Sequence, residues 1–344
     1  MPAPARSWAV SRRACGPAGS LGAGGLAAPG GPLSHGSAPV FQAMIPPEAL
    51  VLVDASAAIF PVYFAAGDRY RDDDGAAAGA RVGWFDRLLR YRLALPPDAR
   101  LGAAFDEALG TGFRHDLDSA YKAHRPLADP DLKAELQQCR AMTRALGIAE
   151  SASRRFEADD LLALAATRGR PRPLVLVSGD KDLLQLLRPG DLRWRPERPA
   201  PEPYDAVREA LGFAPEAMAH YLALVGDSSD GIAGVPGVGV VTATRLLQRF
   251  PSLEALYGAL EQEGEGALAG LPRSARLAAQ LVAGRAQAEH ALTLTRLDGA
   301  VPRAFDPARA APPPLTAERL EEALRVGGLL RYRSRFFAQI PARA

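Results

Sequence analysis

Short apolar runs alternate with longer amphipathic stretches along the first two thirds of this chain. Buried strands are predicted at residues 50–53, 101–105 and 174–178. Helical spacing of apolar positions is found at residues 81–95, 131–146 and 157–168. Strands that alternate with helices favour a mostly parallel sheet that is covered by helices on both faces. We therefore predict an α/β domain over residues 44–204.

The pattern changes after about residue 200, where apolar runs of strand length stop. Proline-rich breaks lie at 196–203 and 311–314. Helical patterns recur at 205–211, 215–225, 240–249, 252–262, 274–296 and 316–326. We therefore predict a helical domain over residues 205–340.

Residues 1–43 are rich in alanine, glycine, proline and serine, and such a segment buries too little apolar surface to order itself. Arg12 and Arg13 are similar to the start of a targeting peptide, but no apolar core follows them. Two interpretations stay open for this stretch: a disordered low-complexity tail, or a misassigned start with Met44 as the true initiator.

Composition narrows the class of protein. Of the 344 residues 48% are hydrophobic and 23% are charged, which is typical of a soluble globular protein. No apolar stretch reaches the roughly 20 residues of a membrane helix. The two cysteines, Cys15 and Cys139, do not favour a disulfide framework, so we expect a reducing compartment. The net charge of +2 does not exclude a nucleic acid partner, because local asymmetry of charge steers a charged ligand.

Acidic residues gather where the predicted strands end and helices begin. Asp54 and Asp106 directly follow the first two strand-like runs, and Asp180 closely follows the third. Ligands of open α/β sheets bind outside the carboxyl ends of parallel strands, so these acids would share one crevice. The whole set comprises Asp54, Asp106, Glu157, Asp159, Asp160, Asp180, Asp182, Asp227 and Asp230.

Each acid alone has an ordinary explanation as a helix cap, a first-turn residue or a turn residue. The joint pattern indicates more, because carboxylates at close range stay ionised only with positive charge between them. Acids without histidine or cysteine select Mg²⁺ or Mn²⁺, and pairs of acids suit two ions at a phosphoryl-cleaving site. Three pairs share a face by spacing: Glu157 with Asp160, Asp180 with Asp182, and Asp227 with Asp230.

A glycine-rich hairpin at 234–239 opens the predicted helix at 240–249. Glycine-rich turns at helix starts present free backbone N–H groups to an anion, and a nucleic acid phosphate fits them. A plain turn between helices is the alternative. The candidate DNA-binding residues are Gly234, Val235, Gly237, Val238, Gly239 and Thr242.

A polar and basic segment at 110–130 precedes the helix near 131–146. It is either a solvated loop or a flexible lid that neutralises phosphates near the metals. Tyr121 is a candidate for stacking on a base. The candidate catalytic residues are Arg114, Tyr121, Lys122 and Arg125, with His115 and His124 as surface or phosphate contacts.

Three segments together resemble the signatures of one family, the 5′-nucleases. They are FEADDLLA at 156–163, SGDKDLLQLL at 178–187 and GDSSDGIAGVPGVG at 226–239. This is the flap endonuclease and 5′–3′ exonuclease family, which includes the nuclease domain of bacterial DNA polymerase I. The resemblance spans about residues 48–300. It implies a PIN-like, resolvase-like sheet followed by a helical domain with a helix–three-turn–helix motif.

The resemblance also implies roles for individual residues. It assigns Lys122 and Arg125 to the reacting phosphate, and the 226–249 region to the grip on duplex DNA, with K⁺ bound by hairpin carbonyls. The first metal group would comprise Asp54, Asp106, Glu157, Asp159 and Asp160, and the second Asp180, Asp182, Asp227 and Asp230. Two departures stand out. The first helix, at 55–61, lacks the family's basic residue, and Gly231 replaces its usual asparagine.

The function expected is that of a stand-alone bacterial, cytoplasmic nuclease that needs two Mg²⁺ or Mn²⁺ ions. It would cut 5′-flap, nicked or 5′-ended duplex DNA in replication or repair, as a monomer without a membrane partner. Exonuclease and flap endonuclease action, and DNA and RNA-primer strands, stay open. Two alternatives remain: a non-catalytic DNA-junction binder and a PIN-like ribonuclease.

Overall fold

The computed structural model describes residues 44–66, 69–107, 110–125, 129–198, 200–297, 306 and 311–340. Residues 1–43, with the two interpretations of that stretch, lie outside the described part. None of the described helices is long and apolar enough to cross a bilayer.

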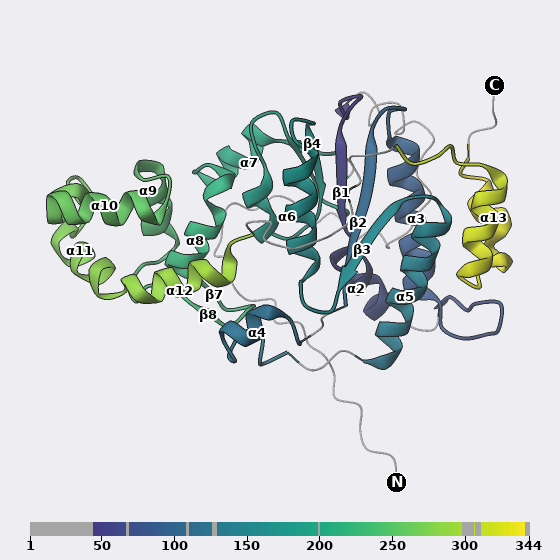
Figure 1. Cartoon of the computed structure of the whole chain (residues 1–344), viewed down its shortest axis with the longest axis horizontal. Coiled ribbons are helices and arrows are strands. Elements are labelled where there is room, and N and C mark those ends of the chain that lie inside the picture. The colour runs from purple at the N-terminus through teal and green to yellow at the C-terminus, as the bar shows by residue number, and fades with distance from the viewer. Residues whose placement is uncertain are drawn as a thin grey trace, which may run out of the picture. The chain divides into compact units, whose positions relative to one another are not determined.

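A six-stranded sheet forms the centre of the α/β part (Figure 1). Its order is β3-β2-β1-β4-β5-β6, and every pairing is parallel except that of β5 with β6. The predicted mostly parallel sheet is therefore confirmed. The strands are β1 Leu50–Asp54, β2 Arg100–Asp106, β3 Ala149–Ser153, β4 Leu174–Val177, β5 Leu192–Trp194 and β6 Glu202–Pro203.

Alternation along the central strands divides the core in two. Leu50 and Leu52 of β1 pack on one face with helix α6 (Ala158–Gly169), while Val51 and Val53 face the opposite side. Because successive strand residues point to opposite faces, an unbroken apolar run serves both layers at once. The second face is covered by α2 Ala55–Ala66, α3 Gly79–Ala94 and α5 Pro130–Ala145.

Strand β3 was not predicted from the sequence. Its residues, AESAS, form no apolar run, and all five are only partly buried because the strand lies at the sheet edge. Pairing with β2, from Gly102 opposite Ala149 to Asp106 opposite Ser153, fixes the extended backbone instead. Neighbouring backbone groups, rather than side-chain hydrophobicity, therefore specify this strand.

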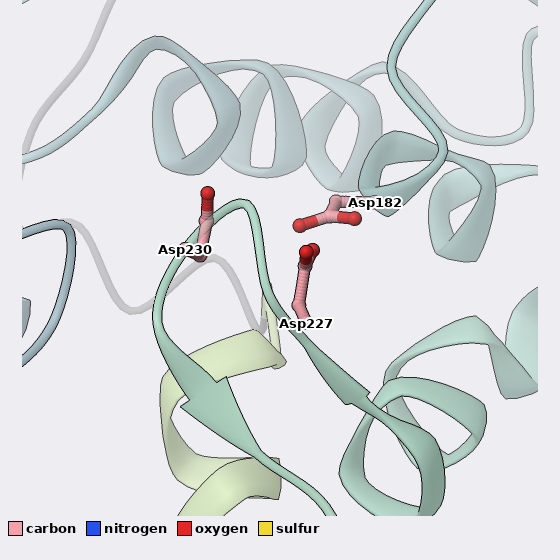
Figure 2. A group of neighbouring side chains, drawn as sticks. All are labelled: Asp182, Asp227 and Asp230. Atoms are coloured by element: carbon pink, nitrogen blue, oxygen red, sulfur yellow. The ribbon is translucent and has the colours of Figure 1, made fainter. Parts of the chain in front are cut away.

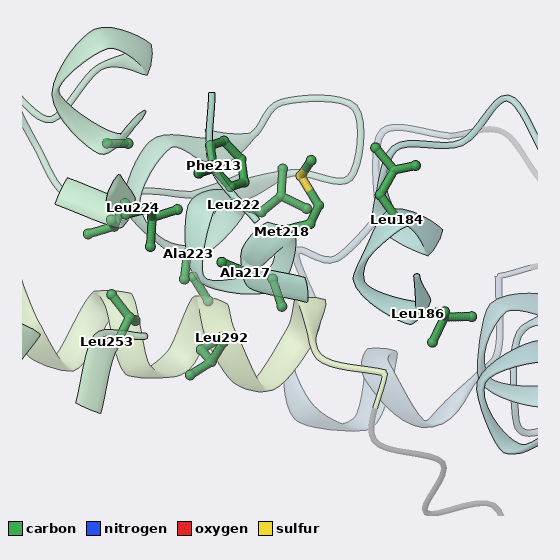
Figure 3. Packing of buried hydrophobic residues seen from close by; sticks show 14 of the residues in the cluster. Leu184, Leu186, Phe213, Ala217, Met218, Leu222, Ala223, Leu224, Leu253 and Leu292 are labelled. Atoms are coloured by element: carbon green, nitrogen blue, oxygen red, sulfur yellow. The ribbon is translucent and has the colours of Figure 1, made fainter. Parts of the chain in front are cut away.

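Helices dominate the chain from residue 204 onward, as predicted. The single helix predicted at 274–296 is in fact two helices, because the chain turns at Gly284. Val235 packs closely there, and a Cβ at Gly284 would lie 2.7 Å from Val235 Cγ1. Helix α8 packs against α12, and Figure 3 shows buried residues of this region such as Ala223 and Leu292. The elements are α7 Tyr204–Leu211, η3 Pro215–Ala217, α8 Met218–Val225, β7 Gly226–Asp227, β8 Ile232–Ala233, α9 Val240–Arg249, α10 Leu253–Glu263, η4 Gly264–Leu268, α11 Ser274–Ala283 and α12 Arg285–Thr295.

The last helices return to the α/β part, although the sequence placed them with the helical domain at 205–340. Phe336 meets Phe85 of α3 edge to face, with ring centroids 4.8 Å apart. Arg81 of α3 donates to the Gly327 carbonyl at 2.7 Å. These contacts bury the apolar side of the C-terminal segment on α3 and α5, beside which α13 lies in Figure 1. The segment comprises α13 Ala317–Val326, η6 Leu330–Tyr332 and α14 Arg333–Phe337.

Replacing Phe336 by alanine tests this docking. Phe336 is fully buried, so Phe336→Ala should lower the free energy of unfolding by about 3–5 kcal/mol through lost burial and a residual cavity. Leu330→Ala, at a side chain that is 37% exposed, should cost less than about 1 kcal/mol. Urea denaturation measures both. Equal effects of the two changes would show that the C-terminal helices do not dock as described.

Candidate metal centre

Five predicted acids meet at the carboxyl edge of the sheet. Asp54 and Asp106 are the last residues of β1 and β2, and Asp180 lies three residues beyond β4. Glu157 and Asp159 come from the start of α6, which follows the neighbouring strand β3. Parallel strands deliver their carboxyl ends to one edge, which is why residues so distant in sequence converge.

Asp54 is the most deeply buried member of this first group, at 4% exposure. It accepts hydrogen bonds from the Ala57 backbone N–H and the Ser178 hydroxyl, each at 3.0 Å. Burial, together with the charges of Asp106 and Asp180, raises the pKa of Asp54 to about 7. Like charges have therefore been gathered here at a cost in free energy that a cation would relieve.

Asp106 and Asp159 share this environment. Asp106 accepts from the Ala158 backbone N–H at 2.7 Å, which ties β2 to the first turn of α6. Burial and the charge of Glu157 raise the pKa of Asp106. Burial and the charges of Asp54, Asp180 and Asp106 raise the pKa of Asp159 well above its usual value. These mutual effects show that the carboxylates lie within electrostatic reach of one another.

Asp160 differs from this group in being paired with an arginine, although it also accepts from the Glu157 backbone N–H at 3.0 Å. The Arg114 guanidinium donates two bonds of 2.7 Å to its two oxygens and a third to the Leu294 carbonyl. Arg114 and Asp160 are 3% and 5% exposed. This is a bidentate buried ion pair that joins α6 to the end of α12. Arg114, predicted as catalytic, and Asp160, predicted as a metal ligand, are each occupied by the other.

A second group of acids comes from two other segments. Asp182 begins the 3₁₀ helix η2 (Asp182–Leu186), and Asp227 and Asp230 flank the turn between β7 and β8. Ligand oxygens of the three carboxylates lie within 4.8 Å of one another. Figure 2 shows Asp182 directed toward Asp227 and Asp230. Oxygen ligands at this spacing suit a hard divalent cation.

The second group differs internally in its charge balance. Lys181 Nζ lies 2.6 Å from Asp227, which also accepts from the Ser229 hydroxyl at 2.6 Å. These donors lower the pKa of Asp227 against the opposing effect of burial. Lys181 lies farther from Asp182, 3.4 Å from one of its oxygens, and burial and the charge of Asp180 raise the pKa of Asp182 to about 7. Asp180 thus links the two groups, since its charge acts on both Asp54 and Asp182.

The basic segment contacts both groups of acids. The Tyr121 hydroxyl, which has one proton to donate, lies 3.0 Å from a Glu157 oxygen and 3.2 Å from an Asp230 oxygen. Lys122 Nζ lies 2.9 Å from both Glu157 oxygens, and Arg125 donates to Asp230 at 2.6 Å. The described part of the segment is therefore fixed to the acids rather than a free lid. Tyr121 is only 2% exposed, so its ring offers no face for the base stacking that we considered.

The backbone of this segment is held as tightly as its side chains. Lys122 has a left-handed φ of 51°, which costs energy for a residue with a Cβ, and its N–H donates to the Asp230 carbonyl at 2.8 Å. Gly231 has a φ of 74°, and a Cβ there would lie 3.0 Å from the Ala120 carbonyl. Glycine at this position, where the family usually has asparagine, therefore allows the turn to pack closely against the basic segment.

The glycine hairpin lies beside the turn that carries Asp227 and Asp230. Val235 and Val238 are buried, while Val240 and Val241 at the start of α9 are 62% and 64% exposed. Among the described residues no side-chain hydrogen bond caps α9, and Gly239, Val240 and Val241 are exposed, so the first N–H groups of the helix are available to an anion. Gln287 supports the hairpin from α12 by donating to the Gly234 carbonyl at 2.8 Å. Gly234 is required sterically, since a Cβ would lie 2.3 Å from the Gly226 nitrogen.

Two serines complete the site and were not singled out from the sequence. Ser178 bonds Asp54 through its hydroxyl and also accepts from the Asp180 N–H at 2.9 Å. Ser56 accepts from the Asp106 N–H at 2.8 Å. Ser178 lies within the SGDKD segment, which was the available signal. Ser56 carries no such signal, because only the sheet register brings it beside Asp106.

Family models match the chain in two parts. The model of the 5′–3′ exonuclease N-terminal resolvase-like domain matches residues 49–201, and that of the 5′–3′ exonuclease C-terminal SAM fold matches residues 213–318. A 5′–3′ exonuclease of Mycobacterium tuberculosis is 33% identical over 239 residues, which are 62% of this chain and 74% of that protein. The chain belongs to the 5′–3′ exonuclease family. The resemblance found in the sequence is thereby confirmed.

Other members of the 5′–3′ exonuclease family are larger. DNA polymerase I of Pseudomonas aeruginosa is 36% identical over 219 residues, 63% of this chain. The chain spans about a quarter of the length of such polymerases (24% in this case). Among solved structures, the 5′-exonuclease of T5 has a TM-score of 0.54 at 17% identity, covering 84% of this chain and 98% of that one. The catalytic core of Rad2 has a TM-score of 0.54 at 13% identity, covering 87% and 94%. These two likenesses confirm the fold.

Two substitutions separate structural from metal-binding acids in this member of the 5′–3′ exonuclease family. Asp160→Asn should lower the free energy of unfolding by about 3–5 kcal/mol, because it removes the bidentate partner of buried Arg114 and leaves it only Glu157, which is 3.6 Å away. Asp182→Asn should not destabilise the metal-free protein, since it removes one charge from a crowded group. The same change should reduce the rise in Tm that Mg²⁺ produces. Thermal unfolding with EDTA and with Mg²⁺ measures both variants, and the reverse pattern would refute the assignment.

Proposed function

We propose that this protein is a divalent-metal-dependent 5′–3′ exonuclease and 5′-flap endonuclease that hydrolyses DNA phosphodiester bonds. The observation that carries the proposal is the convergence of two carboxylate groups at one sheet edge, linked by Asp180 and contacted by one basic segment. A protein that only bound DNA would have no use for so many buried acids, since they repel phosphates.

The donor set fits Mg²⁺ or Mn²⁺. All candidate ligands are carboxylates, and hard divalent cations prefer oxygen. Burial and neighbouring carboxylates raise the pKa of Asp54 and of Asp182, and a cation beside each acid would offset both effects, which favours one ion per group. Such ions supply Lewis-acid activation of water and of the phosphodiester. We assign Asp54, Asp106, Glu157, Asp159 and Asp180 to the first ion, and Asp182, Asp227 and Asp230 to the second.

Basic side chains of the 113–125 segment neutralise the reacting phosphate in this proposal. Lys122 and Arg125 form hydrogen-bonded ion pairs with Glu157 and Asp230. A phosphate bound between the two groups of acids would therefore lie within reach of both basic side chains. The strained backbone of Lys122 holds its side chain in place before substrate arrives. Arg114 contributes by fixing α6 against α12, rather than by contact with substrate.

Duplex DNA is bound through its backbone at the hairpin. The outward N–H groups at the start of α9 match a phosphate, and Thr242 lies in the same turn. The hairpin residues are Gly234, Val235, Gly237, Val238 and Gly239. K⁺ at hairpin carbonyls is a further part of the proposal. The protein would act as a monomer, because both groups of acids and the hairpin belong to one chain.

Named relatives support this substrate. One T5 structure is described as a flap endonuclease in a pseudo-enzyme-product complex with DNA and metal ions, and Rad2 as bound to DNA substrate. The M. tuberculosis relative is named a 5′–3′ exonuclease. A PIN-like ribonuclease would share the acidic sheet edge, but the hairpin favours a duplex. A non-catalytic junction binder is disfavoured by the crowded acids.

A cleavage assay on labelled 5′-flap DNA, with matched single-stranded RNA beside it, tests the function. The protein should cut the flap with Mg²⁺ and not with EDTA. Asp180→Ala should lower the cleavage rate at least about a hundredfold while DNA affinity is retained, because Asp180 links the two groups of acids. Full activity of Asp180→Ala would refute the metal assignment, and preferential cutting of the RNA would favour the ribonuclease.

Acid placed at the start of α9 tests the hairpin. Val241→Glu should raise or maintain Tm, because a carboxylate in the first turn interacts favourably with the helix dipole by about 0.3–1 kcal/mol. The same charge should repel a phosphate and weaken duplex binding by about tenfold or more. Val241→Gln is the neutral control. Fluorescence anisotropy gives the affinities, and equal affinity of both variants would place the DNA elsewhere.

A further inference from the structure

Arg193 extends from β5 to the edge of the metal centre. It stands opposite Leu176 in the parallel pairing with β4, one residue before that strand ends. Its Nη2 donates to the Gly179 carbonyl at 3.1 Å, and Gly179 directly precedes Asp180. The guanidinium therefore lies beside the acid that links the two carboxylate groups, on the β5 side.

The charge of Arg193 is unpaired, in contrast to its neighbours. Lys122, Arg125 and Lys181 each bond a carboxylate of the centre, and Arg114 bonds Asp160 next to it. Within the described part of the chain, Arg193 has no carboxylate oxygen within 4.0 Å and bonds only the carbonyl. Its neighbour on the same strand face, Arg195, takes Glu202 instead.

The surroundings of Arg193 favour an added anion. The side chain is half-buried, and its Nε is buried without a hydrogen-bond partner. Burial, followed by the nearby Arg195, lowers the pKa of Arg193, although Glu202, Glu197 and Asp180 act in the opposite direction. A partly buried guanidinium that contacts no carboxylate loses hydration that a bound anion restores. Phosphate matches its planar fork with two parallel hydrogen bonds. Asp180 is exposed, so the space outside this pair is open to a ligand.

We propose that Arg193 is a positioning residue that binds a backbone phosphate of the substrate strand next to the scissile bond, on the β5 side of the centre. The inference rests on the proposed nuclease function and adds a contact outside the 113–125 segment and the hairpin. Lys122 and Arg125 contact the acids from the basic segment, whereas Arg193 approaches Asp180 from the sheet. Phosphates on two sides of the reacting one would then hold the strand in register.

A second role is possible for the same side chain, and it predicts different measurements. If Arg193 served only to hold the Gly179 carbonyl, its loss would misplace Asp180. Metal affinity and the rate at saturating DNA would then fall while DNA affinity stayed constant. A phosphate contact instead gives weaker binding, a higher KM, a nearly unchanged kcat and a weaker dependence of affinity on salt.

The experiment compares Arg193→Gln, Arg193→Lys and Arg168→Gln with the unmodified full chain. Arg168→Gln is the matched control: it removes the same charge as Arg193→Gln, and Arg168 is exposed near the end of α6, away from its acidic first turn. Fluorescence anisotropy with 5′-flap DNA and Ca²⁺ gives the affinity at several salt concentrations. Cleavage with Mg²⁺ gives KM and kcat, and thermal unfolding checks that each variant is folded.

Arg193→Gln should bind the flap about tenfold more weakly and should lower the slope of log affinity against log salt by about one. Arg193→Lys should keep most of the affinity, and Arg168→Gln should match the unmodified protein. Unchanged affinity and slope in Arg193→Gln, with or without a fall in kcat, would overturn the inference. If the unmodified chain neither bound nor cut the flap, the nuclease proposal itself would fail.

Discussion

Repulsion among buried carboxylates is the constraint around which this molecule is organised. Burial raises the pKa of Asp54, Asp106 and Asp159, and neighbouring carboxylates raise each of the three further. The acids are held in this arrangement by their positions on the sheet and on the first turn of α6. Hydroxyl and N–H donors bonded to the carboxylates help to fix them there. The crowded acids destabilise the fold, but they form a site that attracts cations, as is common at functional centres.

The basic segment, packed against the β7–β8 turn, places positive charge beside both groups of acids. Lys122 and Arg125 reach Glu157 and Asp230, one in each carboxylate group, and the Lys122 N–H bonds the Asp230 carbonyl. The two groups are therefore not independent sites. Whatever moves the segment changes the charge balance of both, so metal binding and phosphate binding are expected to be coupled through it.

Much of this was predictable from the sequence, and the exceptions have physical reasons. Apolar runs ending in Asp54 and Asp106 predicted both the parallel strands and the convergence of acids. The edge strand β3 escaped detection, because an edge strand needs no apolar run. The pairing of Asp160 with Arg114 could not be predicted from the sequence either. Helical spacing places Asp160 on the same face as Glu157, but it does not show that α4 (Phe113–Leu117) brings Arg114 to that face. Likewise, amphipathic periodicity in the last helices shows that they bury a face, not which neighbour receives it.

The return of the last helices to α3 has a consequence for how the chain is connected. The elements between residues 317 and 337 pack with α3 and α5 on one face of the sheet, whereas the helices between residues 204 and 295 share the core of the other face, so both stretches are anchored on the same sheet. A single backbone nick between residues 297 and 317 would separate the covalent chain, yet the severed end would stay attached through the Phe85–Phe336 contact and its surroundings. The terminal helices are therefore held by non-covalent packing, and we expect the two fragments of such a nicked protein to remain associated.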